Sequence, residues 1–276
     1  GAQDQLRTLE AASMFLIPLD RRREWYRYHA LFREFLLGEQ RRVEPDLLPK
    51  LHLRAADWYE SNGSPAMALE HLLNTTERDR SVQLLAALVL PTYQAGQMST
   101  VQRWVSALGD AAIEEYPPLA VLTAWIAALT GQTAEAQRWA AILDAASFDL
   151  VPADGSASFD SARAMLRAFM CVTGPAQAMA DASFALAAEP PWSVWRDQAL
   201  CAYAEAHLLA GDVDGAGALF AEASAVATVN GNADMCILSE FELAVLAMDQ
   251  DRWLEAAEHV EVALVTIEEH RMYDYV

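Results

Sequence analysis

The sequence is poor in cysteine, and it holds no long apolar run. Cys171, Cys201 and Cys236 stand far apart, with neither a CxxC pair nor a cysteine–histidine cluster. This pattern excludes a disulfide framework and a metal site of the usual spacing. No stretch approaches the ~18 apolar residues of a membrane-spanning helix, and none has the layout of a secretory signal. We therefore expect a cytoplasmic protein with reduced cysteines and no metal.

Basic residues are scarce as well. The 276 residues include 19 Lys and Arg against 39 Asp and Glu, which gives a net charge of −20 at pH 7. A surface this negative repels the phosphates of nucleic acids and the anionic headgroups of membranes. We therefore expect this chain to bind neither nucleic acid nor a membrane directly.

Alanine dominates the hydrophobic residues, which make up 54% of the chain. Valine, isoleucine and threonine are comparatively few. Small side chains of high helix propensity suit helices that pack closely against one another. The composition therefore predicts an all-α protein.

The first forty residues differ from the rest. A short helical stretch is followed by an apolar run at 14–19, a polar turn and the aromatic run Trp25-Tyr-Arg-Tyr28. Two β-prone runs around a polar turn predict a hairpin, and the amphipathic pattern that begins at His29 predicts a helix. Helix, hairpin and helix outline a short winged-helix tail, which we place at residues 1–42.

From residue 43 onward one pattern recurs. A turn residue has a small residue seven positions before it and another five positions after it, as Gly131 has in Ala124 and Ala136. This spacing is typical of tetratricopeptide-like repeats, in which small residues stand where paired helices cross. The turn residues are Gly63, Gly96, Gly131, Gly211 and Asp251, with a weaker unit near Thr173-Gly174. Residues 43–276 are therefore predicted to form a superhelix of helical hairpins with a concave side.

Two segments break this repeat. Residues 149–158 are predicted to be a linker between repeats, and Glu189-Pro-Pro-Trp192 is predicted to be a rigid corner that breaks a helix. Interruptions of this kind open pockets that regular stacking would fill.

The concave side is the candidate binding surface. In stacked helical pairs this side is lined by the residues that stand thirteen, ten, six and three positions before each turn. The residues at these positions, together with the tryptophans near the corner, are a mixture of polar and aromatic side chains. The candidate ligand-binding residues are Trp125, Asp160, Arg163, Arg167, Trp192, Trp195, Gln198, Glu205 and Phe241. Planar carboxylate, amide and guanidinium groups bind vicinal hydroxyls, while aromatic rings cover the apolar face of a sugar. The alternative is that the tryptophans are core residues and the charges are solvated.

Two parts of the chain carry a family resemblance. The runs Phe15-Leu-Ile-Pro-Leu-Asp20 and Trp25-Tyr-Arg-Tyr-His-Ala-Leu-Phe-Arg-Glu-Phe-Leu36 resemble the end of the nucleotide-binding module in MalT-like regulators. These are large LuxR-type transcriptional regulators of the signal-transducing ATPase class. Residues 51–63 and 66–71 are similar to the first repeat of their helical sensor. Beyond Leu73 the resemblance is one of architecture.

The resemblance implies a regulator in several parts, with an ATPase domain before this region and a helix-turn-helix domain after it. We expect neither here, because the sequence has no G-x-x-x-x-G-K-[ST] motif and no cofactor site of its own. ATP or ADP is the cofactor expected for the full-length regulator, and its other domains are expected partners.

Histidine and acidic residues give little indication of chemistry. In the wider ATPase class a histidine at the comparable winged-helix position contacts the bound nucleotide, so the resemblance makes His29 a nucleotide sensor in the full-length protein. The alternative is that His29 caps or packs the start of a helix. His71, His207 and His259 show no metal-like spacing and no carboxylate partner in the sequence. With no nucleophile motif or converging carboxylates, we do not expect an enzyme.

Two functions remain open. The first is sensing of a small polar inducer, for which the resemblance supplies the class of sugars or oligosaccharides. Bound inducer would favour one curvature of the superhelix and so bias the ATPase and DNA-binding domains. The second is a docking scaffold that binds a partner protein or peptide in the concave groove, and self-association is also left open. A closed pocket of polar and aromatic residues favours the first, and an apolar or like-charged groove favours the second.

We predict that the purified 276-residue protein neither hydrolyses ATP nor binds DNA, because it lacks the phosphate-binding motif and is strongly negative. Phosphate release and binding to a promoter duplex across a salt series measure this. Tight, salt-resistant binding to the duplex would contradict the prediction.

Overall fold

The computed structural model describes residues 2–12, 15–23 and 25–272. These residues form helices throughout, apart from one two-stranded antiparallel hairpin, which confirms the predicted fold class. The chain divides into two compact units, Gly1–Thr76 and Glu77–Val276, which we call the N-terminal unit and the C-terminal unit. The domain boundary predicted between residues 42 and 43 falls inside the N-terminal unit. No helix in the described part of the chain is both long and apolar enough to cross a membrane.

The N-terminal unit begins with the predicted helix, hairpin and helix. These elements are α1 (Ala2–Ala11), β1 (Leu16–Pro18), β2 (Tyr26–Tyr28) and α2 (Ala30–Val43). The strands pair with Leu16 opposite Tyr28. Asp20 fixes the turn, because its carboxylate accepts hydrogen bonds from the backbone N–H groups of Arg22 and Trp25, at 3.0 and 2.8 Å. Met14 of the predicted apolar run lies outside the described residues.

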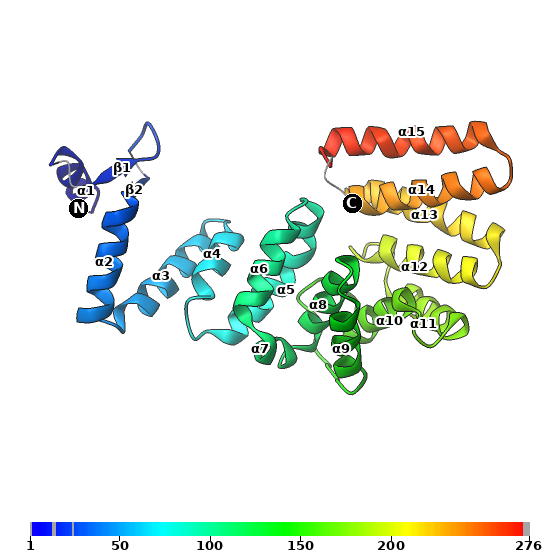
Figure 1. Ribbon diagram of the computed structural model, residues 1–276, viewed down its shortest axis with the longest axis horizontal. Helices are drawn as coiled ribbons and strands as arrows, with labels where there is room; N and C mark the ends of the chain where they lie inside the picture. Colours follow the sequence, from blue (N-terminus) through cyan, green and yellow to red (C-terminus); the bar gives the residue numbers. More distant parts are fainter. Residues whose placement is uncertain (1, 13–14, 24, 273–276) are drawn as a thin grey trace. The chain divides into compact units, whose positions relative to one another are not determined.

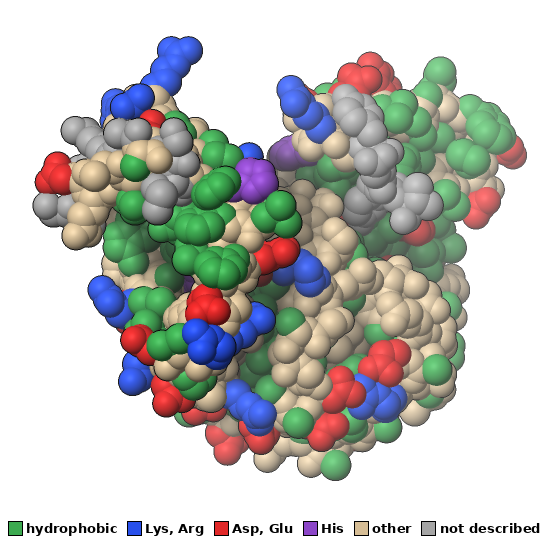
Figure 2. Space-filling model, turned by 60° about the vertical axis from the view of Figure 1, so that its left-hand side comes forward, with side chains coloured by type: hydrophobic (Ala, Val, Ile, Leu, Met, Phe, Trp, Pro, Cys, Tyr) green, Lys and Arg blue, Asp and Glu red, His purple; other side chains and the backbone are tan. Residues whose placement is uncertain are grey.

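The amphipathic side of α2 is not covered within this unit. The helix has no fully buried residue, and its predicted apolar positions Leu31 and Phe35 are 72% and 61% exposed. Figure 2 shows hydrophobic side chains gathered on the surface of the N-terminal unit. The apolar residues predicted for one side of α2 therefore lie at the surface of this unit.

The first repeat consists of α3 (Leu47–Ser61) and α4 (Pro65–Leu72). Ala56 and Ala68, the small residues of the predicted pattern, are fully buried between the two helices. An aromatic and histidine cluster extends from this hairpin. The Nδ1 atoms of His52 and His71 lie 2.9 Å apart, and the Tyr59 ring stacks on His71 with 5.4 Å between the ring centroids. Burial lowers the pKa of both histidines, and the proximity of His71 lowers that of His52 further.

The C-terminal unit is a series of helices in which most pack against the next, except that α10 packs against α8 rather than α9. Figure 1 shows its later members as antiparallel neighbours. The helices are α5 (Arg78–Gln94), α6 (Met98–Leu108), α7 (Asp110–Glu114), α8 (Pro117–Leu129), α9 (Thr133–Asp144), α10 (Phe159–Met170), α11 (Pro175–Ala188), α12 (Arg196–Leu209), α13 (Val213–Asn230), α14 (Ala233–Asp249) and α15 (Trp253–His270).

The predicted repeat pattern is visible in the core of this unit. The small residues on either side of each turn are at most 4% exposed: Val89, Val101, Ala124, Ala136, Ala204, Ala216, Ala244 and Ala256. The turn residues themselves adopt left-handed backbone conformations, with φ of 72° at Gly131, 82° at Gly211 and 54° at Asp251. Glycine suits this conformation because it has no Cβ to collide with the backbone. Small residues and turns thus repeat together.

The linker and the corner that interrupt the repeats are fixed against each other. The indole Nε1 of Trp195, at the corner before α12, donates to the Asp154 carbonyl in the linker, at 3.0 Å. Glu189, 1% exposed at the end of α11, accepts hydrogen bonds from the Ala157 N–H at 3.1 Å and the Ser161 hydroxyl at 2.6 Å. These buried hydrogen bonds fix the linker and the corner in one conformation.

Phe220 tests the packing of the repeats. It is fully buried in the cluster formed by α12, α13 and α14, so we expect Phe220→Ala to lower the free energy of unfolding by about 3–5 kcal/mol through lost contacts and a residual cavity. Val229→Ala, on the same helix but 87% exposed, should change it by less than about 0.5 kcal/mol. Urea unfolding followed by circular dichroism measures both. Equal losses would contradict the packing described here.

The histidine pair gives the N-terminal unit a pH-dependent stability. Because the pKa of His52 and His71 is lowered on folding from the usual 6.5, the unfolded chain binds more protons in acid. Their contribution to stability is complete above about pH 6.5 and is lost as the pH falls below it. Urea unfolding from pH 7.5 to 5 should show this loss, and the loss should be smaller in His71→Gln. The control His270→Gln should retain the parent's pH profile.

Candidate functional site

A cavity of about 250 Å³ lies within the C-terminal unit, where side chains of α5, α6, α8, α10, α12 and α14 come together. We call it the main cavity. Most of its wall is apolar. Its polar lining consists of Tyr93, Gln198, Glu205 and Asp234, and its aromatic lining includes Trp125, Phe169 and Trp195. None of the residues that line it is basic.

The structure brings four of the nine candidate ligand-binding residues to the main cavity: Trp125, Trp195, Gln198 and Glu205. Trp125 precedes Gly131 by six positions, and Glu205 precedes Gly211 by six. The same distance from two turns places the two side chains at equivalent positions of the α8–α9 and α12–α13 hairpins, between which the α10–α11 hairpin lies. Whether they bind a ligand stays a prediction, but their convergence follows from the repeat.

The aromatic lining is held in place by packing and by one hydrogen bond. The rings of Trp125 and Phe169 are 4.6 Å apart at their centroids and inclined at 38°. Trp195 is 7% exposed, and its bond to the Asp154 carbonyl fixes its ring. These rings form a wall suited to the apolar face of a ligand.

The two acids in the cavity are strongly desolvated. Burial raises the pKa of Glu205 to about 7, and the negative charge of Glu242 contributes. Burial also raises the pKa of Asp234 to about 6, although a hydrogen bond with Tyr93 acts in the opposite direction. Asp234 is 5% exposed, and its Oδ1 atom has no hydrogen-bond partner. A buried carboxylate oxygen without a donor is costly unless something supplies one.

A second cavity of about 380 Å³ adjoins the first, and Leu90 lines both. We call it the polar cavity, because Gln94, Asp154, Asn230 and Asn232 line it. Burial raises the pKa of Asp154, whose Oδ2 atom is buried without a partner. This cavity lies at the interrupted repeat, since Asp154 and Gly155 of the linker and Val194, two residues after the corner, form part of its wall.

Asp160, Arg163 and Arg167 lie outside both cavities. Arg163 donates to the Leu143 carbonyl at 3.0 Å and pairs with Asp160 at 2.7 Å. Arg167 pairs with the buried carboxylate of Asp181 at 2.6 Å. These side chains therefore connect neighbouring helices of the stack.

The different position of these three residues has a cause in the chain. The turn between α10 and α11 has four residues, 171–174, whereas the turns at 130–132 and 210–212 have three. Phe169, two residues after Arg167, is the residue of α10 that lines the main cavity. The register counted from Thr173 therefore does not hold in this unit.

The remaining candidates line neither cavity. Trp192 is 82% exposed at the corner, and Phe241 is 40% exposed on α14. His29 is exposed at the start of α2, and its side chain makes no capping hydrogen bond. Its ring packs near Phe15, with 6.4 Å between centroids. A ligand or nucleotide role for these residues stays a prediction.

Several lining residues were missing from the sequence prediction. Leu90 and Tyr93 stand six and three positions before Gly96, so the same rule would have found them had it been applied to that turn. Asp234 follows the Asn232 cap in the first turn of α14, where an acid is ordinarily explained by the helix dipole. Its sequence position alone gave no indication of a cavity.

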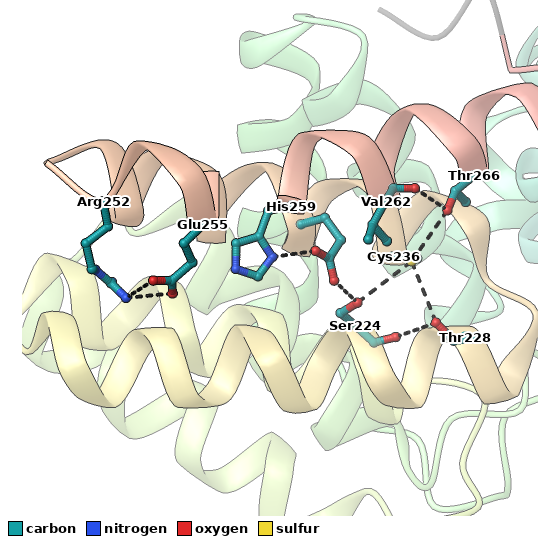
Figure 3. A network of polar contacts seen from close by, with 9 residues as sticks. Ser224, Thr228, Cys236, Arg252, Glu255, His259, Val262 and Thr266 are labelled. Carbon is teal, nitrogen blue, oxygen red and sulfur yellow. Dashed lines mark hydrogen bonds and ion pairs between the residues drawn. The ribbon is translucent and has the colours of Figure 1, made fainter. Parts of the chain in front are cut away.

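A network of buried polar groups connects α13, α14 and α15 (Figure 3). The Ser224 hydroxyl donates to Glu240 Oε1 at 2.5 Å, and His259 Nδ1 lies 2.7 Å from Glu240 Oε2. His207 likewise lies 2.7 Å from Asp212. The expectation that these histidines lack carboxylate partners was therefore wrong, because the preceding helix α14 supplies the partner of His259 and the turn after α12 supplies that of His207.

The order of the contacts in this network does not suit nucleophilic catalysis. A serine nucleophile needs a base that accepts its proton, and a carboxylate that orients the base. Here the carboxylate of Glu240 lies between Ser224 and His259 and contacts both. Among the described residues, no group of three or more His, Cys, Asp and Glu is arranged to hold a metal ion. The network is better explained as a set of structural hydrogen bonds that connect three helices.

Comparisons with known proteins agree with this architecture. Residues 1–48 match the MalT winged helix domain. The transcriptional regulator MalT of Vibrio parahaemolyticus is 29% identical over 122 residues, which are 44% of this chain and 14% of that protein. MalT of Klebsiella pneumoniae is 30% identical over 129 residues, which are 46% of this chain and again 14% of the relative.

A solved structure extends the likeness in fold. The crystal structure of a signal transduction ATPase with numerous domains (STAND) and a tetratricopeptide repeat sensor, from Pyrococcus horikoshii, matches with a TM-score of 0.52 at 14% identity. The match covers 97% of this chain and 46% of that one. The chain is therefore MalT-like, with a segment similar to the MalT winged helix domain at its start and a fold similar to that of a STAND protein with a tetratricopeptide repeat sensor.

Proposed function

We propose that this chain is the inducer-sensing region of a MalT-like transcriptional regulator, and that it acts without enzymatic chemistry in the cytoplasm. The observation that carries the proposal is the main cavity, in which an aromatic wall and a buried carboxyl oxygen without a partner converge. A concave, mostly apolar space with a few convergent polar groups is typical of small-molecule sites.

A sugar or oligosaccharide is the ligand class that the family resemblance implies, and the two adjoining cavities support it. The rings of Trp125 and Phe169 suit the apolar face of a sugar ring. The carboxylate of Asp154 and the amides of Asn230 and Asn232 in the polar cavity suit vicinal hydroxyls. Hydroxyl groups would supply donors to Asp154 Oδ2, which has none.

Ligand binding would be coupled to the arrangement of the repeats. The lining of the main cavity comes from helices between α5 and α14, so one small molecule would contact several successive repeats. A ligand that contacts them in one curvature stabilises that curvature over others. In the full-length regulator this would bias the ATPase domain, with its ATP or ADP, and the DNA-binding domain.

The docking scaffold remains the alternative. A peptide needs an open groove along several repeats, whereas the convergent polar and aromatic groups here border a space of about 250 Å³. We therefore favour a small molecule as the occupant of the main cavity.

The proposal predicts that a mono- or oligosaccharide raises the melting temperature of the protein, because a ligand that binds only the folded state stabilises it. For the sugar with the largest effect, Phe169→Ala should weaken binding about threefold to tenfold through lost ring contact. Phe184→Ala, 51% exposed on α11, is the matched control. Thermal shift and isothermal titration measure both effects.

Two outcomes would contradict this proposal. If no sugar or other small polar compound raises the melting temperature or gives heat of binding, the sensing role fails. If a compound binds but Phe169→Ala binds it as the parent does, its site lies outside the main cavity.

A further inference from the structure

We propose that the ligand of the main cavity carries an ammonium group, so that the site recognises a small organic cation. This inference rests on the proposed sensing function and adds the chemical class of the group that enters the main cavity. It is carried by the acidic lining of that cavity, by the unpaired oxygen of Asp234 and by the aromatic wall.

Every titratable group that faces the site is an acid. Glu205 on α12 and Asp234 on α14 line the cavity, and the lining contains no Lys, Arg or His. The groups that interact with these two are also acids: Glu242 on α14, Asp197 and Cys201 on α12, and Tyr93 on α5. Buried like charges repel one another, and a cation placed among them relieves both the repulsion and the loss of solvation.

Asp234 provides an acceptor that lacks a donor. Its side chain is 5% exposed and lines the cavity, and Oδ1 has no hydrogen-bond partner, although Tyr93 bonds to the same carboxyl group. Glu205 lines the same cavity. An ammonium group has three donors and a full charge, so it can satisfy carboxylates on two helices with charge-assisted hydrogen bonds.

The aromatic wall suits the same kind of ligand. Trp125 and Phe169 pack with their centroids 4.6 Å apart at the cavity surface, and Trp195 completes the wall. The face of an aromatic ring carries negative electrostatic potential and attracts a cation more strongly when water is excluded. An amino-substituted sugar would combine an ammonium group in the main cavity with hydroxyls in the polar cavity.

The raised pKa values predict the pH dependence of binding. Without ligand, Glu205 has a pKa of about 7 and Asp234 one of about 6, so both carry a proton part of the time near neutrality. An ammonium ligand binds the ionised carboxylates and displaces those protons. Its affinity should therefore rise as the pH increases through these values, by about tenfold between pH 6 and pH 8. A neutral ligand that bonds to a protonated carboxyl would show the opposite trend or none.

A matched pair of probes separates charge from shape. 2-Phenylethylamine and 2-phenylethanol have nearly the same size, but only the amine is a cation at pH 6 to 8. With the full 276-residue protein, isothermal titration at pH 6 and pH 8 should show binding of the amine, tighter at pH 8. The alcohol should bind at least about tenfold more weakly at pH 8. Equal binding of the two, or an amine affinity that does not change with pH, would overturn the proposal.

Single substitutions locate the effect. Glu205→Gln keeps the size of the side chain and removes its charge, so it should weaken amine binding at pH 8 about tenfold and reduce the pH dependence. Asp234→Asn should do the same through the other helix. Glu222→Gln, on the exposed side of α13, is the control and should bind the amine like the parent. Unchanged binding in both cavity variants would overturn the proposal.

The result also separates this inference from the proposed function. If neutral sugars raise the melting temperature and lose affinity in Phe169→Ala while amines do not bind, the ammonium proposal fails and the sensing function stands. If neither sugars nor amines bind, both fail.

Discussion

Close approach between paired helices is the constraint on which the C-terminal unit depends. Helices can cross with their backbones near one another only where the side chains at the crossing are small. The fully buried pairs Ala124 and Ala136, and Ala204 and Ala216, occupy those crossings. A larger side chain there would separate the helices and change the angle at which the next hairpin stacks. The positions of Trp125 and Glu205, each next to such an alanine, are set by the same crossings.

The polar cavity lies where this regularity is interrupted. Regular stacking would bring successive hairpins into contact along their length. Between α9 and α10, and between α11 and α12, the chain instead makes irregular segments held by Glu189 and by the bond from Trp195 to Asp154. Asp154 and Gly155 of this junction line the polar cavity, and Trp195 lines the main cavity. The same buried bonds that stabilise the irregular segments therefore also shape the cavity walls.

Periodic features could be predicted from the sequence, and local irregularities could not. Turn residues and small residues recur at fixed distances, so the helices, the crossings and the convergence of Trp125 with Glu205 follow from spacing alone. Arg167 was misplaced because one additional residue in the turn at 171–174 changed the register. The partners of His259 and Asp234 lie on other helices. The spacing of the repeats does not show which polar residues of two different helices come into contact.

The acids of the main cavity destabilise the folded chain, and a ligand that pairs with them can remove this destabilisation. Desolvation raises the pKa of Glu205 and Asp234, and each raised value means that the folded protein holds the ionised form less favourably than the unfolded chain does. Apolar residues of similar size would fill the same space without this cost. Because the two acids lie on α12 and α14, a ligand that pairs with both would stabilise one relative position of these helices. The contacts that satisfy the two carboxyl groups are also the contacts that fix the two helices. Binding at this site should therefore change the preferred arrangement of the repeats more than binding at a neutral apolar site would.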